Sequence, residues 1–130
     1  MERVTGIGGV FFRATDPNAL AEWYEQHLGI TRVPESYEDG SWWQEEGPTV
    51  FAPFAADTSY FGQPQQVWMI NLRVRDLDAM VAQLRGAGIE VDVDPERYPN
   101  GRFARTHDPE GNPIELWQPE GTDAARPPGG

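Results

Sequence analysis

A repeat at an offset of sixty residues constrains the fold of this chain more than any other feature. The segment VFFRATD at 10–16 aligns with INLRVRD at 70–76, so that the arginines and aspartates coincide and apolar residues alternate in the same register. Alternation with a period of two is typical of a β-strand. Further along, residues 18–20 align with residues 78–80. Each half therefore begins with a strand, followed by an aspartate and then by a segment that is similar in the two halves.

Each half also carries the signals of one helix. Asp16 and Asp76 are good N-cap residues, and Pro17 occupies the first helical position, where proline is favoured. Gly29 and Gly88 follow the two segments and permit the left-handed conformation that ends a helix. Apolar residues recur at spacings of three and four, which gives each helix one apolar stripe for the core. The stripes consist of Leu20, Trp23, Tyr24 and Leu28 in the first helix and Leu77, Met80, Val81 and Leu84 in the second.

The repeat divides a chain of single-domain length into two units. We expect one domain at 1–120, with unit one at 4–56 and unit two at 66–119. The last residues, 121–130, are rich in proline and glycine and are predicted to be a disordered tail. DPEGN at 108–112 has the composition of a tight turn and predicts a hairpin between the last two strands. The strands expected after the helices span 30–33, 41–45 and 49–54 in unit one and 90–93, 102–107 and 113–118 in unit two.

Composition excludes several function classes. With 21 acidic and 10 basic residues, the net charge is −11, and an acidic surface repels phosphate backbones and anionic lipids. We therefore expect no nucleic-acid and no membrane partner. The absence of cysteine excludes thiolate metal sites and cysteine nucleophiles. Residues 1–9 do not have the pattern of a signal peptide, so a cytoplasmic protein is expected.

Two strand–helix–three-strand units in tandem, with DPEGNPIELW at 108–117 closing the second, resemble the vicinal oxygen chelate superfamily. This superfamily includes glyoxalase I, extradiol ring-cleaving dioxygenases, fosfomycin-modifying enzymes and bleomycin-resistance proteins. The resemblance covers residues 4–119 and is supported by the segment 19–30. It implies an α+β fold in which two tandem βαβββ units form a curved mixed sheet with the helices on the outer face. It also implies a homodimer, with the pairing of units within or between chains left open.

The resemblance also indicates where the metal-dependent members of the superfamily hold a divalent ion. The corresponding residues here are Gly9, Phe51, Met69 and Glu115. Such ions need several oxygen or imidazole ligands, and a single carboxylate does not provide them. We therefore expect no metal and no other cofactor. The alternative is an atypical divalent metal site that uses His107 and Glu115 with an unidentified third ligand.

Strand alternation predicts which side chains share the concave face with Glu115. Ala104 and Thr106 are small enough to lie beneath a helix. The residues that alternate with them along the strand would then face the pocket. Trp42 and Trp43 are adjacent, so only one of them can face the pocket. Aromatic and thioether walls with a few polar groups are typical of a small-molecule site. The predicted ligand-binding residues are Phe11, Arg13, Trp43, Phe51, Met69, Asn71, Phe103, Arg105, Glu115 and Trp117.

The polar residues of this face have more than one reading. Arg105 is the best candidate for holding a ligand oxygen, because a guanidinium places two donors in one plane. Arg13 and Arg73 either neutralise an anionic ligand or take part in ion pairs. Glu115 is a candidate general base, with His107 on the neighbouring strand as its partner in acid–base catalysis. Its alternative role is an ion pair with Arg105.

Three function classes follow from these observations. We favour a metal-independent binding protein of the glyoxalase/bleomycin-resistance type that holds an aromatic or planar small molecule. The alternative is a lyase, isomerase or dioxygenase of the same superfamily that uses Glu115 with His107 or an atypical metal site. The third class is a structural or protein-interaction domain whose cavity is filled by its own side chains.

Overall fold

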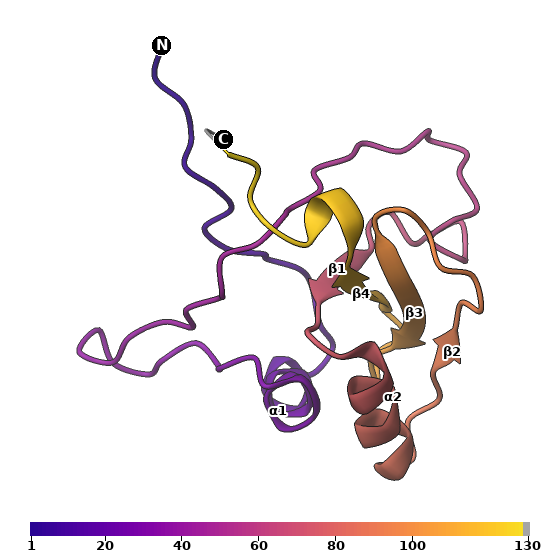
Figure 1. Cartoon of the computed structure of the whole chain (residues 1–130). Coiled ribbons are helices and arrows are strands. Elements are labelled where there is room, and N and C mark those ends of the chain that lie inside the picture. The colour runs from indigo at the N-terminus through magenta and orange to yellow at the C-terminus, as the bar shows by residue number, and fades with distance from the viewer. Residues whose placement is uncertain (129–130) are drawn as a thin grey trace.

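Two helices and a four-stranded sheet make up the core of the computed structural model, which describes residues 1–128 (Figure 1). The predicted α+β class is therefore confirmed. Within residues 1–128, neither helix has the length and apolar composition needed to cross a membrane. In chain order the elements are α1 (Pro17–Leu28), β1 (Ile70–Arg73), α2 (Leu77–Gly86), β2 (Asp92–Val93), β3 (Gly101–His107), β4 (Pro113–Pro119) and the 3-10 helix η1 (Gly121–Asp123).

The sheet is mixed and has the strand order β1-β4-β3-β2. β1 runs parallel to β4, whereas β3 runs antiparallel to both β4 and β2. Parallel neighbours need a crossover connection, and α2 forms part of that connection. The hairpin between β3 and β4 closes where the sequence predicts it, because the N–H of Gly111 donates to the carbonyl of Asp108 at 2.9 Å. The second half of the repeat thus forms a complete βαβββ unit.

The two helices begin and end as the sequence predicts. A side-chain oxygen of Asp16 accepts the N–H of Ala19 at 3.1 Å, and Asp76 accepts the N–H of Ala79 at 3.0 Å. Gly29 caps the end of α1 with φ 72°, a left-handed conformation that favours glycine. In α2 the C-cap is Ala87, and Gly88 follows it with φ 81°, so the repeat extends to the N-caps and to a left-handed glycine after each helix.

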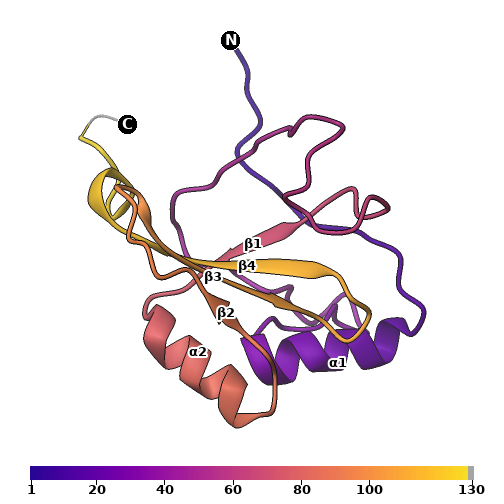
Figure 2. The ribbon, with the colours of Figure 1, turned by 90° about the vertical axis from the view of Figure 1, so that its right-hand side faces the viewer.

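Both helices cover the same face of the sheet (Figure 2). The largest fully buried side chains are Leu77, Leu84, Ile114 and Leu116. Burial of each such side chain contributes ~1.5–3 kcal/mol. Ala104 and Thr106 are buried on this face as predicted, and the hydroxyl of Thr106 donates to the carbonyl of Glu90 at 2.7 Å. Tyr24 is also buried in the core, with Trp23 packed partly against it.

Two acidic side chains join α1 to the turn between β3 and β4. The carboxylate of Glu110 accepts the N–H of Thr15 at 2.6 Å and the N–H of Asp16 at 3.0 Å. The buried carboxylate of Asp108 accepts the Tyr24 hydroxyl at 2.7 Å. Burial, followed by the bond to Asp108 and the charge of that residue, raises the pKa of Tyr24 above its usual value. The first helix is thus held against the sheet of the second unit.

The strands expected in unit one are not formed, which corrects that part of the prediction. The exposed fractions of Phe11, Trp43 and Phe51 are 97%, 89% and 86%, so these side chains are left almost uncovered by the rest of residues 1–128. A strand is stabilised by hydrogen bonds to a neighbour, and Pro48 and Pro53 have no N–H to donate. The segments that pair with no strand of residues 1–128 are 10–14, 30–33, 41–45 and 49–54.

The C-terminal segment predicted to be disordered begins with an ordered turn. Gly121–Asp123 forms η1, and the N–H of Glu120 donates to the carbonyl of Asn100 at 3.1 Å just before it. Residues 129 and 130 of this segment lie outside the described residues.

Candidate functional site

Six side chains line up in two rungs across β1, β4 and β3, on the face opposite the helices. The strand register places them in the same rows, and alternate residues of a strand share one face. The structure thereby brings together five of the ten residues predicted to bind a ligand, with Arg73 as the sixth member of the two rungs. The first rung consists of Asn71, Glu115 and Arg105, and the second of Arg73, Trp117 and Phe103.

Glu115 lies at the centre of the first rung and is only 7% exposed. One of its carboxylate oxygens accepts the side-chain amide of Asn71 at 2.7 Å. The other accepts the phenolic hydroxyl of Tyr60, which comes from the segment between the units. Burial, followed by the bond to Glu115 and the charge of that residue, raises the pKa of Tyr60 to about 12. Each oxygen of the carboxylate therefore accepts a hydrogen bond from a neutral donor.

Arg105 lies beside Glu115 in the register but directs its guanidinium elsewhere. It donates to the carbonyl of Tyr60 and approaches the sulfur of Met69 at 3.1 Å. Its guanidinium carbon lies 4.6 Å from the centre of the Tyr60 ring, a cation–π arrangement. Among residues 1–128 no ion pair joins Arg105 to Glu115, so the ion-pair reading of these two residues is not realised.

Phe103 and Trp117 form an aromatic wall in the second rung. Their rings are stacked, with centroids 6.1 Å apart and planes 2° from parallel. The indole N–H of Trp117 donates to the carbonyl of Asn100 at 2.9 Å, and the residue is only 2% exposed. Trp117 therefore supports Phe103, which is the more accessible of the two rings.

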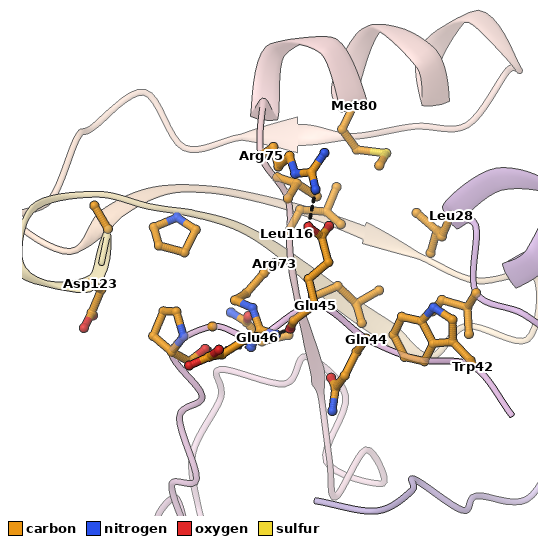
Figure 3. Close-up of a pocket in the computed structure, with 18 residues that line it drawn as sticks. Leu28, Trp42, Gln44, Glu45, Glu46, Arg73, Arg75, Met80, Leu116 and Asp123 are labelled. Atoms are coloured by element: carbon orange, nitrogen blue, oxygen red, sulfur yellow. Dashed lines mark hydrogen bonds and ion pairs between the residues drawn. The ribbon is translucent and has the colours of Figure 1, made fainter. Parts of the chain in front are cut away.

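The guanidinium of Arg73 is hydrogen-bonded to backbone carbonyls instead of to a carboxylate. Its guanidinium donates to the carbonyls of Glu45 and Pro48, each at 2.7 Å. The segment so held borders a hollow of about 380 Å³ along the outer edge of β1, into which Trp42 projects (Figure 3). Trp42 lines this hollow, whereas Trp43, the one of the two adjacent tryptophans predicted to bind a ligand, is 89% exposed.

Four predicted residues from unit one lie outside this arrangement. Phe11, Arg13, Trp43 and Phe51 are all exposed, because the strands that would have carried them to the sheet are unpaired.

His107 is on β3, opposite Pro113, and no hydrogen bond within residues 1–128 joins it to Glu115. It lines a separate shallow hollow together with Trp23 and Asp108. The predicted acid–base pair is therefore not assembled here.

The side chains at the superfamily's metal positions do not fit a divalent cation. Gly9 and Phe51 offer no ligand atom, and the sulfur of Met69 faces the positive charge of Arg105. Within residues 1–128 no three His, Cys, Asp or Glu side chains gather closely enough to hold a metal ion. Glu115 is the remaining donor, and one carboxylate does not make such a site.

Tyr60 is the site residue that the sequence interpretation missed. It lies in the connection between the units, where strand alternation makes no prediction. The signal that could have found it is the aromatic pair Tyr60 and Phe61 within an otherwise polar and small-residue connection. Aromatic residues in a linker indicate that the linker packs on something.

The sequence profile of the Glyoxalase/Bleomycin resistance protein/Dioxygenase superfamily matches residues 6–116, which includes nearly all of both units. A search of curated proteins found no match.

Three solved structures are similar to this chain over most of its length. An antibiotic-binding protein from Streptomyces sp. CB03234 has 25% identity and a TM-score of 0.61, covering 92% of this chain and 100% of its own. A glyoxalase family protein from Bacillus anthracis has 22% identity and a TM-score of 0.52, covering 79% and 84%. A superfamily member from Sphaerobacter thermophilus has 22% identity and a TM-score of 0.50, covering 81% and 90%. The latter two support the fold.

Proposed function

Because the chain belongs to the glyoxalase/bleomycin resistance protein/dioxygenase superfamily, we propose that it binds a planar or aromatic small molecule without a metal ion. The binding surface is the sheet face that carries the rung of Asn71, Glu115 and Arg105. Phe103 forms the adjoining aromatic wall.

The observation that carries this proposal is the composition of that rung. A buried acceptor, an amide and a guanidinium stand in one row beside an accessible aromatic ring. A few convergent polar groups next to apolar surface are what a small-molecule site requires, since the polar groups orient the ligand and the apolar surface supplies affinity. Similarity to an antibiotic-binding protein at 25% identity supports the same class of function.

Metal independence is supported by the donor set. A cation beside Glu115 would be repelled by Arg105, and within residues 1–128 Glu115 belongs to no cluster of three His, Cys, Asp or Glu side chains that could hold it. We therefore assign the recognition of ligand oxygens to Arg105, Asn71 and Glu115 in place of an ion.

Isothermal titration calorimetry tests this function. The purified chain is treated with a chelator and titrated with a panel of aromatic natural products. We expect at least one panel member to bind with a dissociation constant of ~1 μM or tighter, which corresponds to about −8 kcal/mol. Chelation should leave the affinity unchanged.

Two results would contradict the proposal. The first is a panel of which no member binds. The second is conversion of a bound compound, or binding that needs an added divalent ion, because either would favour the lyase, isomerase or dioxygenase alternative.

We also propose that the functional form is a homodimer. The extended segments of unit one expose Phe11, Trp43 and Phe51 almost completely, and water-exposed aromatic residues in such number indicate a contact surface. A second copy of the chain offers these segments the strand partners that they lack. In such a dimer the unit-one residues predicted to bind ligand would complete the site from one chain or the other.

A further inference from the structure

Tyr60 reaches the sheet from residues 55–66, a segment without helix or strand. Within this segment the hydrogen bonds are local turns, such as the N–H of Thr58 to the carbonyl of Ala55 at 3.0 Å. Among residues 1–128, only Tyr60 ties the segment to the sheet by hydrogen bonds. Its hydroxyl donates to Glu115, and its carbonyl accepts from Arg105. Tyr60 is therefore the hydrogen-bonded link between this segment and the site.

The Tyr60 ring is surrounded as a bound aromatic ligand would be. It stacks on Phe54, with centroids 5.4 Å apart and planes 22° from parallel. The guanidinium of Arg105 lies 4.6 Å from the ring centre, and Glu115 receives the hydroxyl. Tyr60 is nevertheless 40% exposed, so it occupies the site without being part of the buried core.

The groups around the Tyr60 ring are of the kinds that recognise a hydroxylated aromatic ring. A carboxylate accepts a hydroxyl proton, a guanidinium is attracted to the ring face, and an aromatic neighbour stacks. We infer that Tyr60 occupies, in the free chain, the position of a ligand's phenolic ring, and that a ligand with a phenolic hydroxyl displaces it from Glu115 and Arg105. The inference rests on the proposed function and adds the chemical class of the ligand.

Burial of Glu115 explains why the ligand needs a hydroxyl group. The carboxylate is 7% exposed, and Asn71 satisfies only one of its oxygens. A ligand that displaces Tyr60 without supplying a donor would leave the other oxygen of this buried carboxylate without its hydrogen bond, which is costly. The site therefore selects a planar phenol over the same ring without a donor.

Competition with Tyr60 lowers the apparent affinity for the ligand. The binding-competent chains are those in which Tyr60 has left Glu115, and the apparent dissociation constant rises as that fraction falls. Removing the Tyr60 side chain removes the competitor. Tyr60→Ala should therefore bind such a ligand more tightly than the unaltered chain, although a substitution in a binding site usually weakens binding.

The probes for the test are 2-naphthol and 2-methoxynaphthalene, which share a ring system but differ in the hydrogen-bond donor. Each is titrated into the full-length chain and into Tyr60→Ala, Tyr60→Phe and Tyr37→Ala. We expect Tyr60→Ala to bind 2-naphthol about tenfold more tightly, and Tyr60→Phe to show a smaller gain because its ring still stacks. Tyr37 is fully exposed, so Tyr37→Ala is the matched control and should change nothing. 2-Methoxynaphthalene should bind every variant more weakly than 2-naphthol.

Hydrogen exchange of residues 55–66 reports displacement directly. Saturation with 2-naphthol should speed amide exchange in this segment, because Tyr60 has been released. Slower exchange would mean that the segment closes over the ligand, and would overturn the inference. Equal affinity of Tyr60→Ala and the unaltered chain would overturn it too, while leaving the proposed function intact. If neither probe binds any variant while other panel members bind the unaltered chain, the phenol class is wrong; if nothing binds, the proposed function fails with it.

Discussion

Glu115 illustrates how one buried carboxylate is stabilised without a cation bonded to it. Tyr60 and Asn71 each donate one hydrogen bond, and both donors are neutral. Arg105 lies close by but is bonded to other groups. A residue in this state attracts hydroxyl or N–H donors, which is the chemistry that we propose for the ligand.

The ionisation of Tyr60 can be measured at the level of the single residue. Its pKa is raised to about 12, whereas a tyrosine in the unfolded chain ionises near pH 10. Folding is thus favoured by the protonated phenol, and this stabilisation is fully present below pH ~10 and is lost as the pH rises towards 12.

The ultraviolet difference titration between the unaltered chain and Tyr60→Phe isolates this ionisation. We expect a tyrosinate midpoint near pH 12 that disappears in the variant. A midpoint near pH 10 would show that the hydroxyl of Tyr60 is not held by Glu115.

The positions of Asn71, Phe103, Arg105 and Glu115 on one face could be predicted from the sequence, because alternation along a strand is a local rule. The position of Tyr60 could not. A residue in an irregular connection is placed by what its side chain contacts, and those contacts come from parts of the chain far away in sequence.

At the scale of elements, the two halves of the repeat behave differently. Both helices form where predicted, since capping and apolar spacing act within a few residues. The strands of unit two form as well, because that unit contains all the partners for its own sheet. The strands of unit one do not, because pairing depends on a neighbour, and neither local alternation nor propensity supplies one.

The two helices begin with the same capping hydrogen bond, so removing either cap should have the same effect on stability. Asp16→Ala and Asp76→Ala each remove a capping hydrogen bond of about 3 Å, and each should lower the free energy of unfolding by ~1 kcal/mol. Urea denaturation of the variants measures this. The control is Asp57→Ala, whose side chain accepts no hydrogen bond in the described part of the chain and should change stability by less than ~0.5 kcal/mol. A loss in the control as large as in the caps would contradict the capping interpretation.

At the scale of the whole molecule, the chain has a well-packed half and an unpartnered half. The core of α1, α2 and the sheet is closed, whereas the unit-one segments carry exposed aromatic and aliphatic residues. A surface with a net charge of −11 keeps such a chain in solution but does not bury these side chains. A second copy does so most simply, through a symmetric interface.

Light scattering of the purified chain checks the homodimer. The expected mass is twice the 14.6 kDa of one chain. Trp43→Ser with Phe51→Ser should shift the mass towards one chain, since both side chains are fully available for the interface. A mass of 14.6 kDa for the unaltered chain across the micromolar range would contradict the proposed dimer.

The central claim is that the sheet face around Glu115 binds a small planar ligand with its own side chains. Calorimetric titration of the chelator-treated chain and of Glu115→Gln with the same panel ligand tests it most directly, with the exposed Glu38→Gln as the matched control. A charge-assisted hydrogen bond of ~1.5–3 kcal/mol predicts that Glu115→Gln weakens binding by about ten- to a hundredfold, while Glu38→Gln binds as the unaltered chain does. Equal affinity of all three proteins would place the ligand elsewhere and contradict the claim.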